Sequence, residues 1–128
     1  MAELLLSKAY HVVGLDQALE RAPNIECVRD QLVLYECDIR DAARVAEIVS
    51  LSRPDEVYHL AAIAGVPAAY RDVRLTFEVN LFGSLNLFEA VKATSRDIRV
   101  LHVGTAGEYG AVSESDMPIH EDIALRPV

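Results

Sequence analysis

The sequence of 128 residues contains no tryptophan, only two cysteines and no long apolar run. Cys27 and Cys37 belong to no C-x-x-C motif and have no matching pair of histidines, so neither a zinc site nor a disulfide framework is indicated. We interpret them as two reduced cysteines of a cytoplasmic protein. The four histidines are scattered along the chain, and no metal site is predicted.

Basic residues are also scarce, and this narrows the range of partners. The chain has 12 Lys and Arg against 20 Asp and Glu, which gives a net charge of −8 with no basic run. Such a balance disfavours nucleic acid and anionic membranes as partners. No segment approaches the ~20 apolar residues that span a bilayer. The N-terminal segment lacks the basic start and the cleavage site of a signal peptide.

What the sequence does contain is an alternation of strand and helix patterns. Its length suits one domain, and 52% apolar residues are enough for a core. Strands alternating with helices predict a parallel sheet with helices on both faces. In chain order we expect a helix end at 2–9, strands at 11–15, 31–37, 56–61 and 98–103, and helices at 42–52 and 70–94. Residues 17–30 are expected to be a connecting loop with one helical turn that Pro23 breaks, and the chain after 110 is expected to be a loop.

The long helix expected at 70–94 has two unusual residues. Gly83 lies inside it at a cost of roughly 1 kcal/mol relative to Ala, which suggests a close contact with a strand that a Cβ would prevent. Asn80 lies on its apolar side, where a buried amide must be hydrogen-bonded. It would tie down a backbone turn or a water, and a structural role explains it as well as a functional one. The apolar stripe comprises Phe77, Leu81, Ser84, Phe88 and Val91.

The strand at 56–61 runs out into the small residues Ala61, Ala62, Ala64 and Gly65. Small side chains at the carboxyl end of a parallel strand leave room for a ligand against the backbone, in the crevice where open α/β sheets bind ligands. The alternative is a tight turn between a strand and a helix.

Two acids follow the first two expected strands. Asp16 ends strand 11–15, where dinucleotide-binding sheets place the acid that receives the ribose hydroxyls about 20 residues after a Gly-rich turn. That turn would precede Met1, and no Gly-rich phosphate loop is expected within the chain. Asp38 and Ile39 follow strand 31–37, where an acid and an aliphatic side chain can receive and cover an adenine. The alternatives are a solvated turn for Asp16 and a helix cap for Asp38, a role that Asp41 fits better.

Thr105, just after strand 98–103, is the candidate hydroxyl for a substrate carbonyl or alkoxide, and Glu108 is the nearest carboxylate. His59 and His102 lie within apolar strands, and we interpret them as core residues rather than ligands.

Several segments, in order, resemble the extended short-chain dehydrogenase/reductase family of NAD(P)-dependent sugar-nucleotide epimerases and dehydratases. Within that family the resemblance is nearest to GDP-mannose 4,6-dehydratases and GDP-4-keto-6-deoxymannose reductases. The similar segments are DIRD at 38–41, RPDEVYHLAA at 53–62, TFEVNLFGSLNLFEA at 76–90, GTAGEYG at 104–110 and the residues Pro118, Glu121, Asp122, Arg126 and Pro127.

The resemblance implies a nucleotide-sugar substrate, NAD as the cofactor and a homodimer formed through the long helix and its neighbour. Phe77 and Phe88 would then be interface residues, the alternative being that they belong to the core. NADP is disfavoured because the carboxylate of Asp16 would repel a 2′-phosphate. Thr105 takes the catalytic Ser/Thr role beside a Tyr activated by a Lys. The implied cofactor contacts are Asp16, Asp38, Ile39, Leu60, Ala61, Ala62, Ile63, Ala64, Asn80 and Val103.

The departures from the family pattern matter as much. Where dehydratases place a glutamate, this chain has Gly107, with Glu108 one residue later, which suits a reductase or an epimerase better. The sequence has no Tyr-x-x-x-Lys, so we expect no turnover. Alternatives are a non-catalytic dinucleotide-binding module and a non-functional truncated remnant.

The expected fold is an incomplete Rossmann-like doubly wound parallel sheet, one partial NAD(P)-binding domain over 1–128 without its first strand and its C-terminal part. Because the missing strand would be central, strands 11–15 and 56–61 should be separated by a gap, close non-natively or take a strand from another chain.

Overall fold

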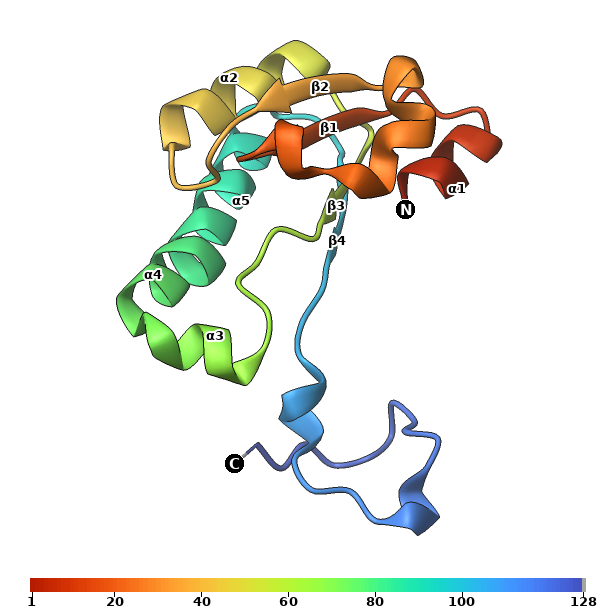
Figure 1. Cartoon of the computed structure of the whole chain (residues 1–128), viewed down its shortest axis with the longest axis vertical. Helices are drawn as coiled ribbons and strands as arrows, with labels where there is room; N and C mark the ends of the chain where they lie inside the picture. The colour runs from red at the N-terminus through yellow and green to blue at the C-terminus, as the bar shows by residue number, and fades with distance from the viewer. Residues whose placement is uncertain (128) are drawn as a thin grey trace.

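A computed structural model describes residues 1–127 as helices and short parallel strands (Figure 1). The strands are β1 Val13–Asp16, β2 Val33–Glu36, β3 Glu56–His59 and β4 Arg99–His102. The helices are α1 Ala2–Ser7, α2 Ala42–Ser52, α3 Val66–Arg71, α4 Val73–Phe77, the π-helix η3 Glu78–Gly83 and α5 Ser84–Ala93. Short 3₁₀ helices are η1 Leu19–Arg21, η2 Pro23–Gln31, η4 Ala106–Tyr109 and η5 Glu114–Asp116.

The four strands form two separate parallel pairs. β1 pairs with β2 so that Asp16 lies opposite Glu36, and β3 pairs with β4 so that His59 lies opposite His102. Within residues 1–127 no ladder joins β1 to β3. Of the three arrangements expected, the structure has the gap, and the chain is an incomplete Rossmann-like α/β fold.

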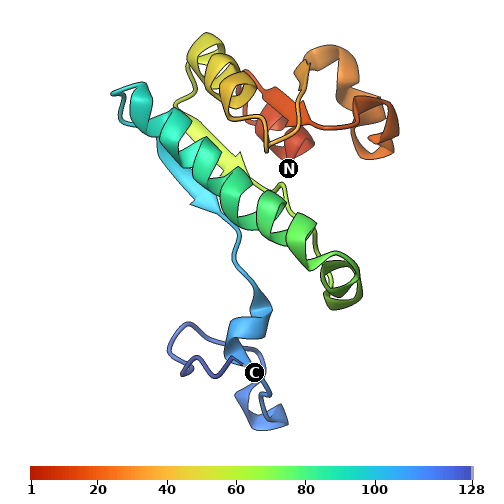
Figure 2. The same cartoon turned by 90° about the vertical axis from the view of Figure 1, so that its left-hand side faces the viewer.

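One core lies under both pairs, where α2 packs along α5 (Figures 1 and 2). Asp41 caps α2 as expected, since its Oδ1 accepts from the Arg44 backbone N–H at 3.0 Å. Val45 is 1% exposed and is the most buried side chain. The remaining buried apolar residues are Cys37, Ile39, Ile48, Val49, Leu87 and Ala90, and Leu15, Tyr35, Val57, Val79 and Val91 pack against them.

The helix predicted at 70–94 is wrong at its start and is not continuous. Its N-terminal part begins at Val66, because Pro67 in the first turn has no N–H to leave unsatisfied. It then breaks at Asp72, whose carboxylate accepts from the Leu75 N–H at 2.9 Å and starts α4. From there α4, η3 and α5 continue as one rod with a π turn in the middle.

The connecting segment predicted at 17–30 holds more helix than the one turn expected there, because η1 and η2 occupy most of it. Pro23 begins η2 rather than breaking a helix, for the same reason that Pro67 begins α3.

The stripe on the long helix is only partly buried. Ser84 is buried, whereas Phe77 and Phe88 are 56% and 39% exposed. All four residues of β4 are exposed as well. His102 is therefore not the core residue predicted from the sequence, because within the described residues only one face of its strand is covered by helix α5.

Beyond β4 the chain forms an arm that both cartoons show extending away from the two sheets (Figures 1 and 2). The arm folds back on itself, and the Arg126 N–H donates to the Glu108 carbonyl at 2.9 Å. Across residues 1–127 no helix is both long and apolar enough to span a membrane.

Candidate functional site

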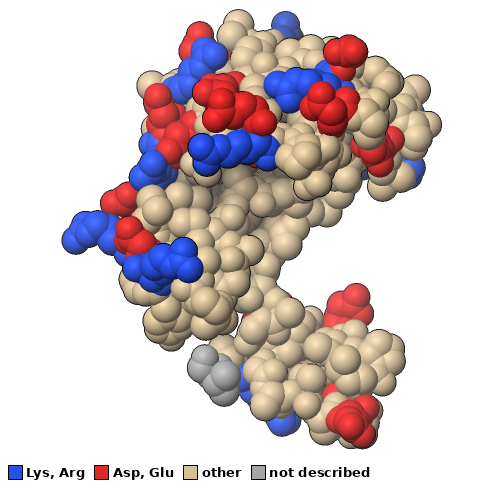
Figure 3. All heavy atoms as spheres, in the orientation of Figure 1, with Lys and Arg blue, Asp and Glu red and all other residues tan. Residues whose placement is uncertain are grey.

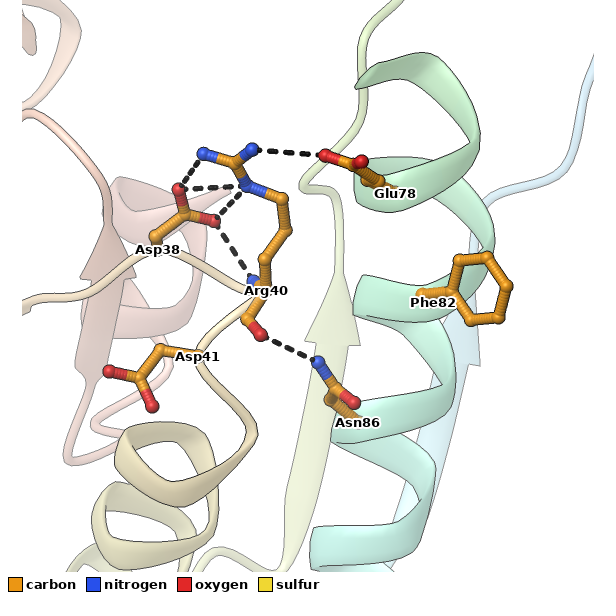
Figure 4. A pocket seen from close by; sticks show the side chains of 6 residues that line it. All are labelled: Asp38, Arg40, Asp41, Glu78, Phe82 and Asn86. Atoms are coloured by element: carbon orange, nitrogen blue, oxygen red, sulfur yellow. Dashed lines mark hydrogen bonds and ion pairs between the residues drawn. The ribbon is translucent and has the colours of Figure 1, made fainter. Parts of the chain in front are cut away.

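Asp38 lies directly after β2 and is held by Arg40 (Figure 4). Its Oδ1 accepts from the Arg40 backbone N–H at 2.9 Å and from Nε at 3.0 Å, and its Oδ2 accepts from Nη2 at 2.6 Å. These hydrogen bonds hold the pKa of Asp38 below its usual range and raise the pKa of Arg40. From the sequence, we expected the Asp38 carboxylate to be free for an adenine amino group. In the structure the adenine would have to share this carboxylate with Arg40.

Ile39 is buried at 8% exposure and contacts the long helix at Gly83. A Cβ built on Gly83 would lie 2.5 Å from Ile39 Cγ2. The close contact expected of Gly83 is therefore real, but it is made to the loop after β2 rather than to a strand.

Asn80 holds the segment that follows β3. Its Oδ1 accepts from the Ile63 backbone N–H at 2.8 Å, and its Nδ2 donates to the Ile63 carbonyl at 3.1 Å. Asn80 thus ties down a backbone turn, as the sequence suggested. Leu60, Ala61, Ala62 and Ala64 of this segment are exposed.

A hydrogen bond between His59 and Ser84 connects β3 to the long helix, next to Asn80. The Ser84 hydroxyl donates to the Asn80 carbonyl at 2.6 Å, so it accepts from His59 Nε2 at 2.8 Å. Burial, and then the nearby His102, lower the pKa of His59. The two imidazole centroids are 5.1 Å apart, and Phe88 meets both rings edge-on. His59 is a satisfied core residue, as predicted.

The other residues proposed from the sequence lie at strand ends but are not gathered into one site. Asp16 is exposed at the end of β1, where its Oδ1 accepts from the Ala18 N–H at 2.9 Å. Val103 is 56% exposed just beyond β4. Thr105 begins the arm, and its Oγ1 accepts from the Gly107 N–H at 3.1 Å. The arm that follows β4 extends away from the two sheets (Figure 2).

The expectation that no Gly-rich turn lies in the chain needs one correction. Gly104, Gly107 and Gly110 have G-x-x-G-x-x-G spacing and follow strand β4. Gly104 precedes the four-residue 3₁₀ helix η4, Gly107 lies within it and Gly110 follows it, so the three glycines do not open a long helix whose N-terminus could bind a phosphate. Gly110 has φ 65° and lies against the Arg126 carbonyl, so its role is to fold the arm.

A pocket of about 500 Å³ lies between the loop after β2 and the long helix (Figure 4). Arg40 Nη1 crosses it to Glu78 Oε2 at 3.3 Å, and Asn86 Nδ2 donates to the Arg40 carbonyl at 3.2 Å. The lining residues are Asp38, Arg40, Asp41, Glu78, Phe82 and Asn86. Among residues 1–127, no group of three or more His, Cys, Asp or Glu could hold a metal ion.

Sequence reasoning missed three of these contacts. Arg40 could have been suspected from its place two residues after Asp38. Asn86 is a lone amide between Leu85 and Leu87, which is the same signal that drew attention to Asn80. The bond between Ser84 and His59 has no sequence signal, because it joins residues 25 positions apart.

Comparison with known proteins gives one family match over the whole chain. The family model described as GDP-mannose 4,6 dehydratase matches residues 1–128. GDP-6-deoxy-D-mannose reductase of Pseudomonas aeruginosa is 42% identical over 74 residues, covering 58% of this chain and 24% of that protein. The chain spans a quarter of the length of that curated relative.

Solved structures of other proteins have a fold similar to that of this chain. UDP-glucose 4-epimerase of Thermus thermophilus, in complex with NAD, aligns with a TM-score of 0.84 at 33% identity over 98% of this chain and 40% of that one. RMD from Pseudomonas aeruginosa, complexed with NADPH, aligns with a TM-score of 0.69 at 27% identity over 91% of this chain and 42% of that one. The two strand pairs are therefore placed relative to one another much as in an intact Rossmann-like protein.

Proposed function

Since the chain belongs to the GDP-mannose 4,6 dehydratase family, we propose that it forms part of an NAD(P)-dependent enzyme acting at C4 of a nucleotide-activated hexose. The observation that carries the proposal is that segments 38–41 and 60–63, at the ends of two parallel strands, are both held on one helix. Ends of parallel strands at such a place form the nucleotide crevice of open α/β folds.

The residues present fit a dinucleotide along this wall. The exposed small side chains after β3 leave the backbone accessible, and a Cβ built on Gly65 would meet nothing within 4 Å. Figure 3 shows a hollow between the main body and the arm whose visible surface carries few charged side chains. An apolar hollow with a few polar groups at its edge is typical of cofactor sites.

The cofactor, when bound, would exchange a hydride with the sugar, and the chain's own residues would orient both. Asp38 would accept from the adenine amino group. Ile39, expected to cover the adenine ring, has its side chain packed against Gly83 and would instead fix the position of the loop that carries Asp38. Asp16 would receive the ribose hydroxyls and favour NAD over NADP by repelling a 2′-phosphate. The rest of the cofactor would contact the residues at the other strand ends and on the long helix, which are Leu60, Ala61, Ala62, Ile63, Ala64, Asn80 and Val103. Thr105 would donate a hydrogen bond from its hydroxyl to the sugar oxygen at C4, and the proton stays on Thr105.

The substrate that we favour is a GDP-mannose derivative, supported by the family match and by the reductase relative. Gly107 at the position of the dehydratase glutamate supports a reduction or an epimerisation rather than a dehydration. The sequence has no Tyr-x-x-x-Lys to activate the reacting oxygen. We propose that residues 1–128 alone do not turn over substrate.

We further propose that the exposed stripe on α3, α4, η3 and α5 pairs with a second copy in the homodimer. Its large apolar side chains are Val66, Tyr70, Val73, Phe77, Leu81, Leu85 and Phe88, each at least 39% exposed. An exposed apolar stripe of this kind is typical of a protein–protein interface.

The test is a binding titration of the chain with NAD and NADP, followed by ligand line broadening in NMR spectra. The chain should favour NAD, and Asp16→Ala should remove that preference while Asp97→Ala, an exposed acid elsewhere, retains it. Equal binding of NADP and NAD by the wild type would contradict the assignment of Asp16. Parallel assays of GDP- and UDP-hexoses with NAD, and of a GDP-4-keto-hexose with the reduced cofactor, should show no turnover. Measurable turnover in any of them would contradict the proposed inactivity.

A further inference from the structure

The long helix contacts the two segments that form the wall of the proposed crevice, and it does so through different side chains. Toward the segment after β3, Asn80 binds both backbone groups of Ile63. Toward the loop after β2, Asn86 Nδ2 donates to the Ile39 carbonyl at 3.0 Å and to the Arg40 carbonyl at 3.2 Å. Two segments that are well separated in the sequence are therefore anchored to one rigid element.

Each anchor is supported by a neighbouring contact. Ser84 is buried, and its hydroxyl links the Asn80 carbonyl to His59 at the end of β3. Gly83 meets Ile39 at a distance that excludes any side chain. The ion pair between Arg40 and Glu78 adds a third contact to the loop, but both side chains are about two-fifths exposed and such pairs contribute little.

The helix is not α-helical between these anchors. Residues 78–83 form the π-helix η3, and the α-helix resumes at Ser84. A π turn contains one more residue than the α turn it replaces, and such turns are frequent at functional sites. Since an α-helix turns about 100° per residue, the extra residue rotates Asn86 by that amount relative to Asn80. The π turn therefore changes the angle between the two amides, and at the angle that results Asn80 faces Ile63 while Asn86 faces Ile39 and Arg40.

We propose that the π turn η3 sets the distance and angle between segments 38–41 and 60–63, with Asn80 and Asn86 as the positioning residues. Neither residue needs to touch the cofactor to do this. The importance of this positioning for cofactor binding rests on the proposed function. The positioning of the two segments by the helix does not depend on it.

The experiment measures hydrogen exchange of single amides by NMR in the 128-residue chain, without cofactor. Asn80→Ala should speed exchange of the Ile63 amide about tenfold or more, the loss expected for one hydrogen bond, and leave the Asp41 amide unchanged. Asn86→Ala should shift the resonances of Arg40 and Asp41 and leave Ile63 unchanged. Asn80→Asp, which keeps the acceptor for the Ile63 N–H, should restore slow exchange there.

Deletion of Phe82 tests the role of the π turn, with Phe82→Ala as the matched control. Phe82 is 54% exposed, so its side chain is not part of the core. The deletion should return η3 to an α-helix, and amides in one of the segments 38–41 and 60–63 should lose their protection from exchange. Phe82→Ala should keep the protection of both segments. If the deletion variant does not fold, the exchange patterns of the two asparagine variants still test whether Asn80 and Asn86 each position their own segment.

The proposal is overturned if Asn80→Ala and Asn86→Ala speed exchange equally throughout the chain, as a purely structural role would require. It is also overturned if the deletion leaves both segments protected. Because no cofactor is present, failure of the proposed function would leave these results unaltered. A chain that shows the expected exchange pattern and binds no dinucleotide would contradict the proposed function alone.

Discussion

Gly83 on the long helix and Ile39 after β2 are in such close contact that a Cβ at position 83 would lie 2.5 Å from Ile39 Cγ2. Ile39 is 8% exposed and belongs to the core, so its branched side chain has little freedom to move away. The absence of a side chain at Gly83 therefore determines how closely the loop after β2 approaches the long helix.

Gly83→Ala should destabilise the chain despite improving helix propensity. Propensity alone would stabilise by about 1 kcal/mol. Overpacking a close contact typically costs about 1–3 kcal/mol, so we expect a net loss of about 1 kcal/mol. The measurement is the free energy of unfolding in urea for Gly83→Ala, Ile39→Ala and the double variant. The double variant should lose less than the sum of the single losses, and stabilisation by Gly83→Ala would contradict the contact.

Asp41→Ala should weaken α2 at its N-terminus. The carboxylate accepts from the Arg44 N–H at 3.0 Å, and loss of such a cap typically costs about 1 kcal/mol. The urea midpoint should fall for Asp41→Ala, with Asp97→Ala as the control for loss of one exposed acid. Equal midpoints for the two variants would show that the cap contributes nothing.

Ser84→Ala should be more harmful than its small change in volume suggests. The hydroxyl links His59 Nε2 to the Asn80 carbonyl, and both partners would lose a buried hydrogen bond. Leaving a buried polar group unsatisfied costs about 1–3 kcal/mol. Ser84→Thr, which keeps a hydroxyl, should lose clearly less. If thermal unfolding gave the same midpoint for Ser84→Ala and the wild type, the link would be unimportant for stability.

Stability should fall as the pH falls through the range where His59 titrates. Burial, and then the neighbouring His102, lower the pKa of folded His59, whereas the unfolded value is about 6.5. Between these two values the unfolded chain binds more protons than the folded chain, so protons favour unfolding. Full stability is expected above about pH 7, with a decline below about pH 6.5 before most carboxylates titrate. His59→Gln should flatten this decline, and the control His11→Gln should keep it.

The sequence predicted those features that depend on local pattern. The four strands, α2 and the Asp41 cap follow from hydrophobic periodicity and capping chemistry, and the structure has all of them. The interruption at Asp72 and the π turn at 78–83 could not be predicted this way. Both depend on tertiary contacts, such as the bonds from Asn80 to Ile63, that an apolar stripe does not encode.

The site was predicted in its parts but not in its geometry. Asn80 does hold a backbone turn, and Gly83 does allow a close approach, as inferred from an amide and a glycine on an apolar face. The ion pair that occupies Asp38 and the exposure of His102 were not foreseen. The first arises from a neighbour two residues away, and the second from the absence of any described element over one face of β4.

The central claim is that the strand ends form one wall of a dinucleotide crevice. The most direct test is a residue-resolved NMR titration of the chain with NAD at millimolar concentrations. The amides of Asp16, Asp38, Ile39 and residues 60–64 should shift together with one common dissociation constant. Shifts confined to other surfaces, or none at these strand ends, would contradict the account.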